Sequence, residues 1–205
     1  MTDAYTVFWT KARCDALRRA ENVGKPLHTL FGGPHTSEPS FRRATVQPGD
    51  DLYPITVRAG VLYILGRVTV GRILTLADYV FERQSLFAPY ITEPPAWALE
   101  PGRSSLSPRY VQASQAFDRL LKASPEYRYL APSCTEEAVE CVDGTPMRLD
   151  CAVSPDLLAR IRYRSRRAER DLSKYICDGR LSGILGVQGI YRLSDETARE
   201  FAALV

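Results

Sequence analysis

The sequence is poor in the residues on which most metal sites and nucleophilic catalysts depend. It has only two histidines, His28 and His35, and its five cysteines include no CxxC or CxH pair. Zinc sites need His or Cys ligands at short spacings, and a Ser or Cys nucleophile needs a base beside it. We therefore expect no metal site, no cofactor and no catalytic residue set. The odd, unpaired cysteine set is typical of a reducing compartment.

The sequence also has no long hydrophobic run. The best candidate, Val61–Val70, is short and is interrupted by Gly66 and Arg67, so no segment is expected to span a membrane. The first residues lack a basic cluster followed by an apolar stretch, which excludes the pattern of a signal peptide. The expected location is the cytoplasm.

Charge of one sign is not in large excess either. The formal net charge is +3, which is too small to indicate a polyanionic partner by itself. Whether such a partner binds therefore depends on where the basic residues lie. Hydrophobic residues make up 45% and charged residues 25%, the balance of a globular protein. The chain is long enough to bury a sizeable core.

Local patterns predict an α+β fold. Tyr5–Thr10 is aromatic and β-branched and predicts a first strand, and a helix is expected after it over Arg13–Ala20. The clearest signal is a β-meander, with one strand over Leu52–Arg58 and a second, long and bent, over Val61–Val70. Gly66 inside that second strand indicates a bulge or a close backbone approach.

Serine caps predict the best-defined helices of the second half. One begins after Ser107 and runs to about Lys122, and a terminal helix begins after Ser194. We expect a domain over residues 1–130 and a helical and extended C-terminal extension over residues 131–205, which packs on it and could belong to the same domain.

Three short motifs in the N-terminal half resemble those of a known superfamily. They are Phe8-Trp9-Thr10-Lys11 at the end of the first strand, Pro48-Gly49-Asp50 before the meander, and Leu65-Gly66-Arg67-Val68 within it. In this order they resemble the PUA-like superfamily, and within it the EVE and ASCH domains. The resemblance implies a small mixed β-barrel with flanking helices. It also implies a pocket that receives a nucleobase, often a modified one, in a family made up chiefly of RNA- and DNA-binding modules.

The residues support a nucleic-acid site of aromatic and basic side chains. An aromatic ring can stack on a base while Lys and Arg neutralise phosphates. Phe8 and Trp9 should point to opposite faces of their strand, so at least one is core, and packing of both is an equal alternative. Arg162 and Arg164 alternate with Ile161 and Tyr163, so as a strand they would present guanidinium groups on one face. The predicted site residues are Trp9, Thr10, Lys11, Arg13, Arg42, Arg43, Arg67, Arg162 and Arg164.

Purely structural roles for these residues and two other functions stay open. The arginines could be solvated or paired with nearby acids, and Glu136 and Glu140 would share one face of a helix, solvated. A small enzyme acting on a nucleotide or small molecule, with His28 or His35 as acid and base, is one rival. A subunit whose C-terminal half binds a protein partner is the other. The residues do not separate RNA from DNA as the ligand.

Overall fold

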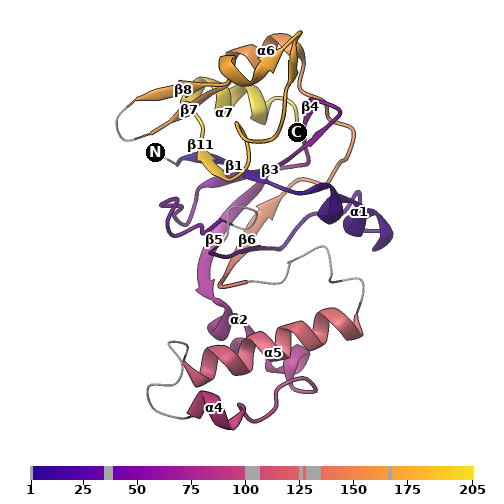
Figure 1. Ribbon diagram of the computed structural model, residues 1–205, viewed down its shortest axis with the longest axis vertical. Helices are drawn as coiled ribbons and strands as arrows, with labels where there is room; N and C mark the ends of the chain where they lie inside the picture. Colours follow the sequence, from indigo (N-terminus) through magenta and orange to yellow (C-terminus); the bar gives the residue numbers. More distant parts are fainter. Residues whose placement is uncertain (1, 35–38, 100–106, 125–126, 128–134, 166–167) are drawn as a thin grey trace.

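The computed structural model describes residues 2–34, 39–99, 107–124, 127, 135–165 and 168–205 (Figure 1). A seven-stranded mixed sheet runs through the middle of the molecule. Its strands are β1 (Ala4–Phe8), β2 (Thr29–Gly32), β3 (Asp51–Arg58), β4 (Val61–Ile64), β5 (Val68–Thr75), β6 (Glu137–Gly144) and β11 (Ile190–Arg192). Two hairpins stand apart from it, β7 (Arg162–Arg164) with β8 (Glu169–Asp171), and β9 (Ile176–Cys177) with β10 (Arg180–Leu181).

The helices lie around this sheet. They are α1 (Lys11–Arg19), α2 (Leu76–Glu82), α3 (Gln84–Phe87), α4 (Ala96–Leu99), α5 (Pro108–Ala123), α6 (Pro155–Arg160) and α7 (Asp195–Ala202), with a 3₁₀ turn at Ser173–Tyr175. In Figure 1, α6 and α7 lie above the sheet and α2, α4 and α5 below the end of β5 and β6. The α+β fold class predicted from the sequence is confirmed.

The sheet joins segments that lie far apart in the chain. Its strand order is β11-β1-β3-β5-β6-β2, with β4 paired to β3. β1 and β3 are parallel, from Ala4 opposite Asp51 to Phe8 opposite Ile55, and the other pairs are antiparallel. Residues on both sides of the predicted boundary at residue 130 contribute strands to this one sheet.

The predicted β-barrel is not found among the described residues, where the sheet stays open. A barrel needs its last strand to pair with its first, but β2 pairs with β6 and β11 with β1, and no ladder joins β2 to β11. The sheet also divides along β3. Asp51 and Leu52 pair with β5, whereas Ile55 to Arg58 pair with β4.

The long bent strand predicted over Val61–Val70 is two strands, β4 and β5, separated at Leu65–Arg67. Gly66 is where Met147 and Thr145 come close to the backbone. A Cβ at this position would lie 3.2 Å from the Met147 sulfur and 3.3 Å from the Thr145 hydroxyl. The close approach predicted for Gly66 is therefore confirmed, and it interrupts the strand.

The two faces of the sheet form separate cores. Phe8 belongs to one of them, with Tyr53 and Phe201 of α7, whereas its neighbour Trp9 belongs to the other, with Leu17 of α1. The two side chains thus point to opposite faces of the sheet, as is expected of neighbours in a strand. A third core joins the helices α2 and α5 to β2 and β6, with Phe31 against Phe117 at its centre.

Two helices begin where the serine caps predict. The Ser107 hydroxyl accepts the N–H of Tyr110 at the start of α5, and the Ser194 hydroxyl accepts that of Thr197 at the start of α7. Within the described ranges, no helix combines the length and the apolar character needed to cross a lipid bilayer.

Candidate functional site: an arginine-lined cleft

The aromatic ring predicted to stack on a base is buried. Only 1% of Trp9 is exposed, and the Arg13 guanidinium carbon lies 4.1 Å from the centre of its ring. Thr10 caps α1 by accepting the N–H of Arg13. Lys11 is exposed and pairs with Asp15 on the same helix. Phe8 and Trp9 therefore both pack in a core, one on each face of the sheet, which is the alternative that the sequence left open. Trp9 offers no open ring face.

Three of the predicted arginines are held by local partners. Arg42 donates to the Ile73 carbonyl at 3.4 Å, and Arg67 pairs with Asp143 at 3.2 Å. Arg162 donates to the carbonyl groups of Ala159 and Ile161 at 3.0 Å each. Each of these three guanidinium groups is thus engaged by a neighbouring group of the protein itself. None of the three residues lines the arginine cleft that is described in the next paragraph.

Arg43 and Arg164, by contrast, line one cleft together with Arg192. This arginine cleft has a volume of about 640 Å³. Its walls come from the turn at Arg43–Thr45, from Arg164 and Ser165 at the end of β7, and from all three residues of β11. Three segments distant in sequence thus bring three arginine residues to the lining of one hollow.

The cleft forms where the β7–β8 hairpin separates from the edge strand β11. Tyr163 and Leu193 still form an antiparallel bridge, and the Ser194 N–H donates to the Arg162 carbonyl at 2.9 Å. Beyond this bridge the strands β7 and β11 are no longer paired, with Arg164 on one side of the cleft and Arg192 on the other. The sequence leaves strand and helix open for this arginine-rich run, and Arg162 and Arg164 lie in the strand β7; of the other arginines in the run, Arg160 lies in α6 and Arg166 lies outside the described residues.

Arg170 of β8 supports the aromatic wall of the cleft. Its guanidinium carbon lies 4.4 Å from the ring centre of Tyr191 and 5.3 Å from that of Tyr163, and it donates to the Gly186 carbonyl at 3.0 Å. The Tyr191 hydroxyl donates to the Gln188 carbonyl at 2.9 Å, which fixes the half-buried ring in the cleft. Tyr163 lies beneath, and burial raises the pKa of its hydroxyl far above the ordinary value.

A buried carboxylate shapes the turn that carries Arg43. Glu137 of β6 accepts the Ser40 hydroxyl at 2.6 Å, the Phe41 N–H at 2.8 Å and the Arg42 N–H at 3.2 Å. The Ser40 hydroxyl in turn accepts the Arg43 N–H at 3.1 Å. The helical spacing considered for Glu136 and Glu140 is wrong, because this segment is strand, and Glu140 pairs with Arg72 and Arg83.

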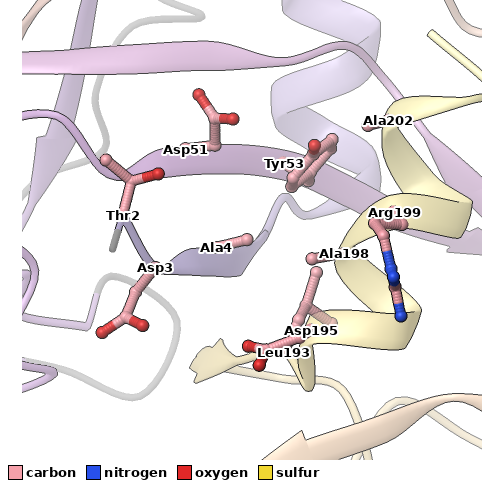
Figure 2. A pocket seen from close by; sticks show the side chains of 10 residues that line it. All are labelled: Thr2, Asp3, Ala4, Asp51, Tyr53, Leu193, Asp195, Ala198, Arg199 and Ala202. Carbon is pink, nitrogen blue, oxygen red and sulfur yellow. The ribbon is translucent and has the colours of Figure 1, made fainter.

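An acidic cleft of about 520 Å³ adjoins the arginine cleft (Figure 2). Its charged lining consists of Asp3, Asp51, Asp195 and Arg199. In Figure 2 the carboxylate of Asp51 points away from those of Asp3 and Asp195. This divergence does not suit a shared cation, and in the described part of the chain no group of three or more acidic, His or Cys side chains is placed to hold a metal.

The histidine predicted as a rival catalytic residue lies elsewhere. The exposed His28 lines a third cleft, of about 540 Å³, with Cys141 and Glu140. Burial raises the pKa of the Cys141 thiol to about 12, so this sulfur stays protonated at neutral pH and is a poor nucleophile. His35 lies outside the described residues.

Three residues of the cleft region are not among the site residues predicted from the sequence, namely Tyr191, Arg192 and Arg170. Ile190-Tyr191-Arg192 ends in the same Tyr-Arg pair as Tyr163-Arg164. This shared pair, beside a β-branched residue, is a signal that could have indicated a second strand with an arginine next to the first.

Comparison with known proteins gives a coarse likeness only. No protein family model matches the chain, and no curated protein matches it. The structure is similar to the crystal structure of a mutant of ZmASCH from Zymomonas mobilis, with a TM-score of 0.41 and 9% sequence identity, over 98% of this chain and 97% of that chain. The assignment to the PUA-like superfamily and to its EVE and ASCH domains stays a prediction.

Proposed function

We propose that this protein binds nucleic acid, with phosphate groups of the backbone in the arginine cleft. The observation that supports this most is the convergence of Arg43, Arg164 and Arg192 on one hollow. A guanidinium group can donate two parallel hydrogen bonds to a phosphate, so three such groups around one cleft are suited to a phosphate chain.

Two further features of the cleft agree with this ligand. The half-buried Tyr191 ring lies among the guanidinium groups, and nucleic-acid sites combine aromatic rings with cations. Arg43 is exposed and makes no ion pair with a described carboxylate, so its charge is available to a ligand. Recognition of a modified base and a cytoplasmic location stay predictions, as does a protein partner for the C-terminal half.

A binding titration with labelled single- and double-stranded RNA and DNA, at low and at physiological salt, tests the proposal. We expect affinity to fall as salt rises, and Arg43→Ala and Arg164→Ala each to reduce the salt slope by about 0.7 on a single strand. Arg148→Ala is the matched control, because Arg148 pairs with Asp150 at 3.2 Å much as Arg164 pairs with Asp195 at 3.3 Å.

Two results would contradict the proposal. One is the absence of binding to any of the four nucleic acids at low salt. The other is equal affinity of the wild type, Arg43→Ala and Arg164→Ala, because the cleft would then not hold the ligand. The comparison of RNA with DNA in the same titration shows which of the two the cleft prefers.

A further inference from the structure

Two of the three arginines in the cleft already hold a carboxylate. Arg164 pairs with Asp195 at 3.3 Å, and Arg192 pairs with Asp3. Both aspartates line the neighbouring acidic cleft (Figure 2). The two clefts are therefore connected through two ion pairs that cross the boundary between them.

These pairs change the charge that a ligand meets. With both of them closed, three guanidinium groups and two carboxylates leave one net positive charge at the arginine cleft. A carboxylate and a phosphate compete for the same N–H donors of a guanidinium group, since each accepts them side by side. A phosphate that takes the N–H groups now bonded to Asp195 or Asp3 must therefore displace that aspartate.

The pairs are open enough to exchange. The side chain of Arg164 is 44% exposed and that of Asp195 62%, and the values for Arg192 and Asp3 are 38% and 26%. Ion pairs at such exposed positions stabilise a protein little, so a ligand can open them at small cost.

We propose that Asp195 and Asp3 are intramolecular competitors of the phosphate groups, which occupy Arg164 and Arg192 until nucleic acid replaces them. This inference rests on the proposed function and concerns the regulation of the same site. The two carboxylates lower the affinity of the cleft for phosphate groups.

The test measures binding of a labelled oligouridine to the full chain and its variants at low salt. We expect Asp195→Asn and Asp3→Asn to bind more tightly than the wild type, each by up to about fivefold, the size of an exposed ion pair. Asp150→Asn is the matched control, because it frees Arg148, which does not line the cleft, and its affinity should equal that of the wild type.

A double-mutant cycle separates competition from general repulsion. If Asp195 acts through Arg164, the gain from Asp195→Asn disappears in the Arg164→Ala background, whereas long-range repulsion between carboxylate and phosphate would persist there. Asp195 is the first residue of α7, so thermal melting checks its variant, and Asp3→Asn tests the same idea outside that helix.

The outcomes are distinct. A wild type that binds, with Asp195→Asn and Asp3→Asn no tighter than Asp150→Asn, overturns the inference and leaves the proposed function standing. An equal gain from Asp195→Asn with and without Arg164 also overturns it. Absence of binding by the wild type and by all variants, both to oligouridine and to the four nucleic acids of the titration above, overturns both.

Discussion

At the scale of the residue, Glu137 connects the sheet to the turn that carries Arg43. Its side chain is buried, and its two oxygens accept three hydrogen bonds from Ser40, Phe41 and Arg42. A buried carboxylate is costly unless its hydrogen bonds are satisfied, so the turn and the strand depend on one another.

Glu137→Ala should lower the free energy of unfolding by about 3 kcal/mol, because three donors lose their acceptor in a buried place. It should also weaken nucleic-acid binding, because the turn no longer fixes Arg43. Urea unfolding and the oligouridine titration measure the two effects.

The neighbouring Glu136→Ala is the control for this change. Glu136 is only partly buried, and its substitution should alter the free energy of unfolding by no more than about 0.5 kcal/mol. Equal stability of the two variants would show that the hydrogen bonds of Glu137 do not hold the turn.

Single residues also mark where prediction from the sequence fails. The sequence does not decide whether the Trp9 ring stacks on a base or packs in a core, and nothing in it distinguishes Glu137 from its acidic neighbours, yet the two residues are only 1% and 7% exposed. Residue type determines which chemistry a side chain can perform, but burial depends on segments that pack from elsewhere in the chain. Trp9 is covered by α1, and Glu137 by a turn that begins at Ser40, 97 positions before it.

At the scale of the element, the predictions that succeeded are those with a local cause. Ser107 and Ser194 cap their helices through hydrogen bonds to the third residue after them, so sequence alone contains the signal. The division of β3 between β5 and β4 and the separation of β7 from β11 depend on distant pairing. For the same reason Arg43 and Arg164 were predicted one by one, but their meeting with Arg192 was not.

The two-residue turn between β3 and β4 also has a local cause. Ala59 and Gly60 both have positive φ, 49° and 77°, as the two central residues of a type I′ hairpin turn require. Ala59→Asn should raise the free energy of unfolding by about 0.5–1 kcal/mol, since Asn tolerates this conformation better than Ala.

Gly60→Ala should have the opposite effect. A Cβ at Gly60 would lie 2.9 Å from the Leu181 carbonyl oxygen, and the left-handed conformation adds a cost of about 1–2 kcal/mol. Urea unfolding of both variants beside the wild type measures the difference. A Gly60→Ala variant as stable as Ala59→Asn would contradict the turn geometry.

At the scale of the whole molecule, each of the three cores contains a buried tyrosine whose pKa is raised by burial. The core that contains Trp9 has Tyr5, the core that contains Phe8 has Tyr53 and Tyr163, and the core between α2 and α5 has Tyr79. In Tyr53 burial raises the pKa to about 12 from the ordinary value of 10.0. The unfolded chain therefore loses these protons at a lower pH than the folded chain.

Stability should accordingly be unaffected by these groups below about pH 10 and should fall above it, by at most about 1.4 kcal/mol per pH unit for each tyrosine. The sign follows because above about pH 10 the folded state binds more protons than the unfolded state. Urea unfolding between about pH 8 and about pH 11 measures the slope.

Tyr53→Phe isolates one contribution to this slope. The variant removes the ionisable hydroxyl and keeps the ring, which packs against Phe201 at a centroid distance of 5.6 Å. We expect a smaller loss of stability with rising pH than in the wild type. An unchanged pH profile would mean that Tyr53 ionises no later in the folded protein than in the unfolded chain.

The pairing of β1 with β11 joins two segments that are synthesised far apart in time. Thr6 and Tyr191 are 185 positions apart, so the ribosome must add all the residues between them before the outer edge of β1 meets its partner. Until then an aromatic and β-branched strand is present with one unpaired edge, which invites pairing with another nascent copy. We therefore expect the yield of native protein in the cell to depend on the speed of translation and on chaperones that cover this edge.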